Sequence, residues 1–270
     1  MSALLAPSRR TLPIRRLGAP ARSAPEHEAN ASIAWRADLT ATVARFGIRP
    51  DGGVPAFEPG QYLALSLTID GRDVQRPYSA VPASADAEIE LLIRLVPGGA
   101  FTPALWRARP GDRIRIGRPK GLFRLEPGDG RTHLLLATGT GIAPLVAMAA
   151  ALRARESRPS LMVVVHGVRE PAELAYRDRL LAWHGEHVRY APVVSGTAPG
   201  TGWAGRRGRI DAGLPSIVGE LGIHPSRAVA YLCGSPAMID GVGGVLRDLG
   251  MAPEAVRSER YWTAGSTLRS

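Results

Sequence analysis

Four consecutive residues of very different chemistry, Arg76 to Ser79, lie near the end of a predicted strand. Arg76 is a permanent cation, Pro77 restricts the backbone, Tyr78 is a flat ring and Ser79 carries a small hydroxyl. Residues 61–69 before them alternate between apolar and polar, and a turn rich in proline, alanine and serine follows. The group is either an ordinary strand end or the binding site of a ligand that needs a cation, a ring and a hydroxyl together.

A glycine-rich turn, ATGTGIAP at residues 137–144, follows an apolar strand and opens a helix. Glycines at such a place let the backbone approach a pyrophosphate, and the start of the helix offers free N–H groups. The turn has neither the GxGxxG spacing of the dinucleotide fingerprint nor the lysine of a P-loop. By itself it is equally compatible with a tight structural turn.

More polar groups follow the other apolar runs of this half. Cys233 and Gly234 end the fourth run, where open α/β sheets bind ligands, although a buried structural cysteine is the alternative. Arginines follow the second and third runs, namely Arg169, Arg206, Arg207 and Arg209. Guanidinium groups there could hold a ribose phosphate in bidentate geometry, or lie in solvent as most arginines do.

Two kinds of sheet must position these residues. Segments 37–48, 61–69, 88–96 and 112–119 alternate or are β-rich and are separated by glycine and proline turns, which predicts an antiparallel six-stranded-type barrel. A short helix is expected at 102–108, with Thr102 as its N-cap. Strands predicted at 132–137, 160–168, 187–195 and 228–234 alternate with helices at 145–156, 171–184 and 235–250, which indicates a doubly wound parallel sheet.

We therefore expect four regions along the chain. Residues 1–32 form a disordered basic tail, 33–130 the barrel domain, 131–262 the α/β domain and 263–270 a C-terminal extension. The first 25 residues carry arginine, serine, proline and alanine and no acid, which is typical of a tail or, alternatively, of an organellar transit peptide. No apolar run is long enough to span a membrane. Because a chain with one cysteine suits a reducing compartment, we expect a cytoplasmic protein.

The composition excludes some classes of protein. The single cysteine, Cys233, excludes an internal disulfide and a cluster held by four thiolates, and no metal site is expected. The net charge of +10 and pI of about 10.8 favour an acidic partner. Because no recognition helix, zinc finger or aromatic RNA platform is present, that partner is expected to be a protein and not nucleic acid.

The order of these stretches resembles the ferredoxin–NADP reductase family, in which an FAD-binding antiparallel barrel precedes an NADP-binding α/β domain. The resemblance covers roughly residues 34–262. Each motif is weak alone, and the order of all seven carries the resemblance. The motifs are FEPGQY (57–62), RPYS (76–79), GGAFT (98–102), GTGIAP (139–144), GRI (208–210), CGSPAM (233–238) and ERYW (259–262).

The resemblance implies that the first half binds FAD. Arg76 then pairs with the FAD pyrophosphate, Tyr78 lies against the isoalloxazine and Ser79 hydrogen-bonds flavin N5. Thr102 falls where the short helix of the family meets the same pyrophosphate, and Trp262 corresponds to a tryptophan that stacks on the adenine. The residues expected at FAD are Arg76, Pro77, Tyr78, Ser79, Gly99, Thr102, Thr140, Tyr261 and Trp262.

The resemblance also implies hydride transfer with a nicotinamide coenzyme, for which Ser79, Cys233 and Glu259 are the expected catalytic residues. Cys233 lies beside the reacting carbon as a spacer and polariser, and Glu259 lies near the proton route to flavin N5. The residues expected at NADP are Thr140, Gly141, Pro144, Arg169, Ser195, Arg206, Arg209, Cys233 and Gly234.

The chain departs from the family pattern at two places. Bacterial relatives with VVSR carry an arginine just after the third parallel strand, whereas this chain has Gly196 in VVSG; Arg169 and Arg209, with Arg206 or Arg207, could compensate. NADPH is therefore expected over NADH, with NADH left open. The second departure is the extension TAGSTLRS after Trp262, which the family branch ending in YW lacks.

Three functional classes remain open. The first is a monomeric NADPH reductase of an acidic ferredoxin or flavodoxin, which we expect. The second is the NADH-linked reductase component of an oxygenase with a separate iron–sulfur protein. The third is a flavin-fold subunit without turnover, against which the intact RPYS, GTGIAP and CGSPAM motifs argue.

Overall fold

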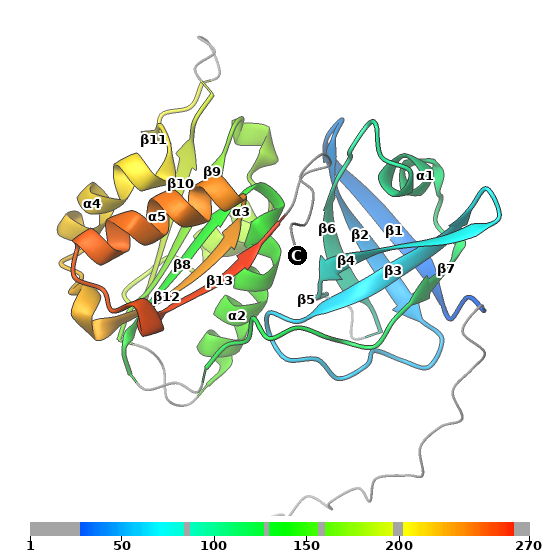
Figure 1. Ribbon diagram of the computed structural model, residues 1–270, viewed down its shortest axis with the longest axis horizontal. Helices are drawn as coiled ribbons and strands as arrows, with labels where there is room; N and C mark the ends of the chain where they lie inside the picture. The colour runs from blue at the N-terminus through cyan, green and yellow to red at the C-terminus, as the bar shows by residue number, and fades with distance from the viewer. Residues whose placement is uncertain (1–27, 84–86, 127–129, 156–159, 197–201, 262–270) are drawn as a thin grey trace, which may run out of the picture.

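The computed structural model describes residues 28–83, 87–126, 130–155, 160–196 and 202–261. Within them an antiparallel curled sheet precedes a parallel sheet, as predicted, and Figure 1 shows the two sheets side by side. The predictions on the tail up to residue 27, on Trp262 and on residues 263–270 lie outside the described residues. No helix in the described ranges is long and apolar enough to cross a membrane.

The antiparallel sheet has the strand order β4-β3-β7-β1-β2-β6-β5. Its strands enclose one apolar core that includes Phe46, Leu65 and Ile93, and helix α1 (Phe101–Arg107) packs on it through Phe101 and Leu105. Six strands are longer than β5, which has two residues. The strands are β1 (Ala31–Thr40), β2 (Val43–Pro50), β3 (Tyr62–Ile69), β4 (Arg72–Ser79), β5 (Val81–Pro82), β6 (Ile89–Arg94) and β7 (Arg113–Ile116).

The parallel sheet has the strand order β11-β10-β9-β8-β12-β13. Strands β9 and β12 are buried along their whole length because helices cover both faces of the sheet. Helices α4 (Ile210–Glu220) and α5 (Pro236–Asp248) pack on one face, and α2 (Ile142–Ala154) and α3 (Arg177–Ala182) on the other. The strands are β8 (Thr132–Thr138), β9 (Met162–Val168), β10 (Val188–Val194), β11 (Arg206–Arg207), β12 (Ala228–Gly234) and β13 (Val256–Arg260).

Helix α2 joins the two halves. Its side chains are buried on nearly every side, as is typical of a helix enclosed by other elements. Leu145 and Met148 belong to the same apolar cluster as Val81 and Leu92 of the antiparallel sheet. The glycine-rich turn that opens α2 is therefore held at the junction of the two sheets (Figure 1).

Three predicted elements differ from the structure. Residues 37–48 were expected as one strand, but β1 and β2 are separated at Ala41 and Thr42, where the Thr40 hydroxyl accepts from two backbone N–H groups. The helix expected at 171–184 is reduced to a 3₁₀ turn (Pro171–Glu173) and α3, because Tyr176 adopts a left-handed φ of 60°. Strand β1 begins at Ala31, inside the predicted tail.

Candidate active site

A hydrogen bond between side chains 182 positions apart joins the two sheets. Ser79 ends β4 of the antiparallel sheet, and its hydroxyl lies 2.7 Å from the hydroxyl of Tyr261. Tyr261 follows β13 of the parallel sheet, and its backbone N–H donates to the Gly234 carbonyl at 2.7 Å. The predicted residues Ser79, Gly234 and Tyr261 therefore meet where the sheets come together.

Cys233 and Glu259 lie next to each other on the parallel strands β12 and β13. Cys233 is fully buried, and burial together with the Glu259 carboxylate raises the pKa of its thiol well above the usual range. Burial also raises the pKa of Glu259 to about 7. At neutral pH the thiol is therefore protonated, and the carboxyl group is poised to hold or release a proton.

The glycine-rich turn packs tightly against Cys233. Residues Gly139–Gly141 form a 3₁₀ turn in which Gly139 has a φ of +54°. A Cβ atom at Gly141 would lie 2.4 Å from the Cys233 carbonyl oxygen, so only glycine fits there. Thr140 is partly buried in the turn, and Pro144 is buried in the first turn of α2. The turn is thus held directly against the carboxyl end of β12.

Three residues near this turn, His166, Arg94 and Glu173, were not predicted as site residues. The Nε2 atom of buried His166 lies 3.0 Å from the Gly139 carbonyl oxygen, and burial lowers the pKa of His166 to about 4, so the neutral ring donates to that oxygen. Arg94 of β6 donates to Glu173 at 2.6 Å, an ion pair between the two halves. His166 and Arg94 stand out in the sequence only as polar residues within apolar runs, and no sequence pattern marks Glu173.

The antiparallel sheet presents part of the predicted FAD set on β4. Arg76 and Pro77 are exposed, and an Nη1 atom of Arg76 donates to the Gln75 carbonyl at 2.7 Å. The ring of Tyr78 is tilted against Phe101 with centroids 6.0 Å apart, and burial raises the pKa of its hydroxyl. Strand β4 thus carries Arg76, Tyr78 and Ser79 in order, and its Ser79 end lies at the junction of the two sheets.

Thr102 does not cap helix α1. The helix begins at Phe101, with Ala100 as its N-cap, and no side chain caps it. The buried Thr102 hydroxyl instead accepts from the backbone N–H of Val96 at 2.8 Å, while Gly99 donates its N–H to the Val96 carbonyl at 2.9 Å. Thr102 therefore fixes the loop before the helix, because its hydroxyl bonds backward along the chain.

The predicted arginines are not alike in their surroundings. Arg206 forms an ion pair with Glu220 with Nη1 3.1 Å from Oε1, and Arg209 pairs with Asp211 at 3.2 Å. The Arg169 side chain has no carboxylate partner among the described residues, and its backbone N–H is held by Glu173 at 3.1 Å. Of the three, Arg169 is the cation that an anionic ligand can reach without displacing a carboxylate.

Ser195 and Gly196 continue this loop beside Arg169. The Ser195 hydroxyl donates to the Val168 carbonyl at 3.1 Å, and the N–H of Gly196 donates to the Arg169 carbonyl at 2.8 Å. A Cβ atom at Gly196 would lie 2.3 Å from the Arg169 carbonyl oxygen. The arginine of the VVSR pattern cannot stand here without a shift of the backbone.

The fold and the junction define an oxidoreductase with a flavin-binding antiparallel domain and a nicotinamide-binding parallel domain. The family model described as Oxidoreductase FAD-binding domain matches residues 37–125, and that described as Oxidoreductase NAD-binding domain matches residues 135–243. The chain is 36% identical over 221 residues to ferredoxin–NADP reductase B of Sorangium cellulosum, covering 79% of this chain and 88% of that protein. It belongs to the ferredoxin–NADP reductase family, whose cofactors are FAD and NAD(P)H.

Other similar proteins serve oxygenases. Terephthalate 1,2-dioxygenase reductase component 2 of Comamonas sp. is 31% identical over 219 residues, covering 79% of this chain, and the chain spans only 62% of its length.

A crystal structure of a ferredoxin NADP+ reductase from Neisseria gonorrhoeae with bound FAD and NADP has a TM-score of 0.74 and 26% identity, covering 86% of this chain and 99% of that one. The predicted fold and family are confirmed, and the relatives include both kinds of reductase.

Proposed function

We propose that this protein transfers hydride between NADPH and FAD and exchanges single electrons with a ferredoxin or flavodoxin. The observation that carries the proposal is the Ser79–Tyr261 hydrogen bond beside Cys233, because it brings the flavin motif of one sheet to the coenzyme edge of the other. When bound, FAD accepts two electrons as hydride from a nicotinamide and gives them up one at a time.

The chain's own residues then bind, orient and supply protons. Arg76 offers charge to the FAD pyrophosphate, and Tyr78 and Ser79 offer a ring and a hydroxyl to the isoalloxazine. Burial keeps the Cys233 thiol protonated, so it acts as a small neutral group that packs against the nicotinamide and not as a nucleophile. Glu259 holds a proton on its carboxyl group near neutral pH and can serve the flavin as a proton donor or acceptor.

NADPH is the proposed coenzyme because Arg169 is available to the 2′-phosphate. A guanidinium that contacts a phosphate without giving up another partner keeps the whole gain of a charge-assisted hydrogen bond. Arg206 and Arg209 also lie after β10 but pair with Glu220 and Asp211, so we assign them smaller roles. An NADH-linked oxygenase reductase is the second candidate, favoured by the dioxygenase relatives and by Gly196.

An anaerobic titration separates these candidates. The purified protein should show a flavin spectrum that one equivalent of NADPH bleaches, and heat should release FAD and no FMN. Preferential bleaching by NADH would favour the oxygenase candidate. A protein that binds FAD but is bleached by neither coenzyme would contradict both.

The proposed partner is an acidic electron carrier, and the reductase is proposed to be a monomer. The net charge of +10 should speed the encounter with such a carrier, and this steering weakens as salt screens the charges. Reduction of an acidic ferredoxin or flavodoxin should therefore slow several-fold between low and high salt. Reduction of a small neutral acceptor, which shares only the coenzyme step, is the control and should change little.

A further inference from the structure

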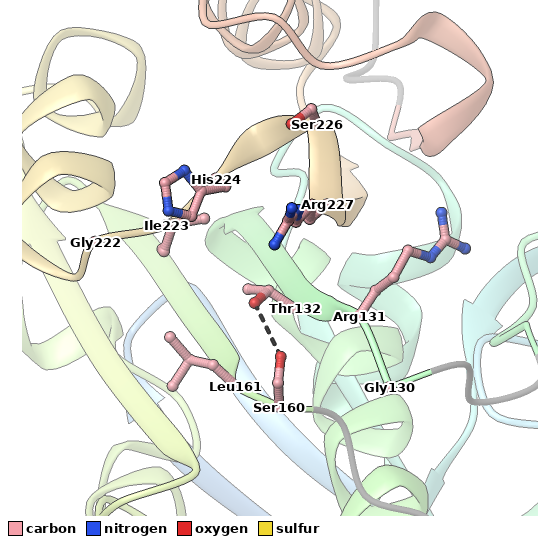
Figure 2. Close-up of a pocket in the computed structure, with 10 residues that line it drawn as sticks. All are labelled: Gly130, Arg131, Thr132, Ser160, Leu161, Gly222, Ile223, His224, Ser226 and Arg227. Atoms are coloured by element: carbon pink, nitrogen blue, oxygen red, sulfur yellow. Dashed lines mark hydrogen bonds between the residues drawn. The ribbon is translucent and has the colours of Figure 1, made fainter.

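A cavity of about 540 Å³ lies at the amino edge of the parallel sheet, opposite the edge that carries Cys233 and the glycine-rich turn. Strand β8 begins at Thr132 and β12 at Ala228 on this edge, and both strands end at the candidate active site. Figure 2 shows the residues that line the cavity, which are Gly130, Arg131, Thr132, Ser160, Leu161, Gly222, Ile223, His224, Ser226 and Arg227.

The polar groups of this cavity suit an anion. None of the ten lining residues is acidic. Figure 2 shows the Arg227 side chain directed over Thr132 and Ser160, and no carboxylate of the described residues pairs with it. Arg131 also lines the cavity, but it lies 3.9 Å from a Glu126 oxygen and its guanidinium is turned away from Arg227. Arg227 is therefore the cation that a bound anion would meet first.

Two hydroxyl groups of the cavity, those of Thr132 and Ser160, point toward each other (Figure 2). The Thr132 and Ser160 hydroxyl oxygens lie 3.3 Å apart, so one proton is shared between them and the other is free to donate into the cavity (Figure 2). Arg227 ends a 3₁₀ turn that begins with Pro225, and its backbone N–H donates to the His224 carbonyl at 2.9 Å. Cation and hydroxyls are thus carried by backbone that is already ordered, which lowers the entropic cost of binding.

The cavity also has room for an organic group. Ile223, which is 7% exposed, and the partly buried Leu161 form an apolar wall. A volume of about 540 Å³ lies within the range of roughly 300–1,000 Å³ that is usual for small-molecule sites. An inorganic anion would leave most of this space to water, whereas a sugar phosphate would fill more of it.

We propose that the cavity formed by Arg227, the Thr132–Ser160 hydroxyl pair and the Ile223 wall is a second ligand site, for a small phosphomonoester of about the size of a sugar phosphate. The site is separate from the coenzyme edge and does not depend on the proposed electron-transfer function. Arg227 holds the phosphate, the hydroxyl of the pair whose proton is free donates to a phosphate oxygen, and the apolar wall contacts the organic part.

The test uses the FAD-loaded full chain saturated with NADP+, so that the coenzyme edge is already filled. Ribose 5-phosphate is titrated while backbone amide resonances are followed by NMR. We expect saturable shifts at residues 130–132 and 222–227. Arg227→Gln should weaken binding about tenfold, because one charge-assisted contact is lost at an exposed position. The matched control is Arg247→Gln, which removes an exposed arginine of α5 and should leave the affinity unchanged.

Four outcomes would overturn the proposal. Shifts that are not saturable, or equal weakening by Arg227→Gln and Arg247→Gln, would show only general attraction to a basic surface. Binding of ribose as tight as that of ribose 5-phosphate would show that the phosphate is not recognised. Should Arg227→Gln unfold, Ser226→Trp tests the same site by narrowing its mouth, and unchanged affinity for ribose 5-phosphate in that variant would contradict the location.

Discussion

Two groups of predicted site residues differ sharply in how the structure holds them. Ser79, Cys233, Glu259 and Tyr261 lie at or just after strand ends from both sheets and are at least partly buried. The Cys233 thiol is neutral at pH 7, and the Glu259 carboxyl, with a pKa of about 7, is about half protonated. Arg169, Arg206 and Arg209 lie in or beside loops after β9 and β10, where two of the three already pair with carboxylates.

The difference follows from where each kind of group is stable. Neutral hydroxyl and thiol groups can be buried when they are hydrogen-bonded, so strand ends can hold them in fixed positions. Guanidinium groups are costly to bury and remain in solvent, where they find carboxylate partners. We therefore expect substitutions at the junction to change the chemistry and substitutions of the arginines to change only coenzyme choice.

The largest expected effect is that of Gly141→Ala. A Cβ atom 2.4 Å from the Cys233 carbonyl forces the turn away from β12, and displacing a reacting group by about 1 Å can cost about 100-fold in rate. We expect kcat/KM for NADPH oxidation with a neutral acceptor to fall by about that factor, with FAD retained. Gly213→Ala in α4, where the Cβ has open space, is the control and should leave kcat/KM unchanged. Equal kinetics in both variants would show that the turn does not position the coenzyme.

The Ser79–Tyr261 contact should give the next largest effect. Ser79→Ala and Tyr261→Phe each remove one hydroxyl of the 2.7 Å pair, and each should lower kcat about tenfold or more. The two hydroxyls share one hydrogen bond. The rise in activation free energy in the double variant should therefore be about 1 kcal/mol smaller than the sum of the rises in the two single variants. Stopped-flow measurement of flavin reduction gives these rates. Strict additivity would place the two residues in separate roles.

A smaller, coenzyme-specific effect is expected for the arginines. Arg169→Ala should weaken NADPH binding about tenfold and leave NADH nearly unchanged, because only NADPH carries the 2′-phosphate. Arg209→Ala should weaken NADPH less than about threefold, since Asp211 already holds the guanidinium. Dissociation constants of NADPH and NADH, measured for the wild type and both variants, test these expectations. Should Arg209→Ala prove the more damaging, the Asp211 pair must open on binding.

The smallest expected effect concerns the Glu259 carboxyl group and pH. Its pKa of about 7 in the folded chain exceeds the ordinary value of 4.5, so folding favours the protonated form. The stability that this group contributes is fully present below pH 4.5 and is lost as the pH rises to about 7. Relative to Glu259→Gln, the wild-type protein should therefore lose about 1 kcal/mol of unfolding free energy between pH 5 and pH 8.

Urea unfolding of both proteins at the two pH values measures this difference. Glu254→Gln, on the exposed 3₁₀ turn Pro253–Ala255, is the matched control and should differ from the wild type by the same amount at both pH values. A wild-type protein that gains stability relative to Glu259→Gln as the pH rises would show that the carboxyl pKa is lowered by folding.

Sequence patterns predicted most of the elements, because burial of one face or both leaves a clear periodicity. The buried runs that became β8, β9, β10 and β12 were all identified, as was the capped helix α5, in which Ser235 accepts from the N–H of Met238 at 3.3 Å. Strand β13 was missed as a strand, since VRSER carries three charged residues and covers the sheet edge. The break at Tyr176 was also missed, because nothing in the sequence marks a tyrosine with a left-handed backbone.

By itself the sequence determined the two kinds of sheet, their order, the family, and the residue types at each strand end, because these depend on local periodicity and on motif order. Only the tertiary structure decided which side chains meet. Ser79 and Tyr261 are brought together over 182 positions, Arg94 reaches Glu173, and Thr102 bonds backward to Val96 instead of capping its helix. Such contacts depend on the packing of one sheet against the other through α2, and no local pattern records that arrangement.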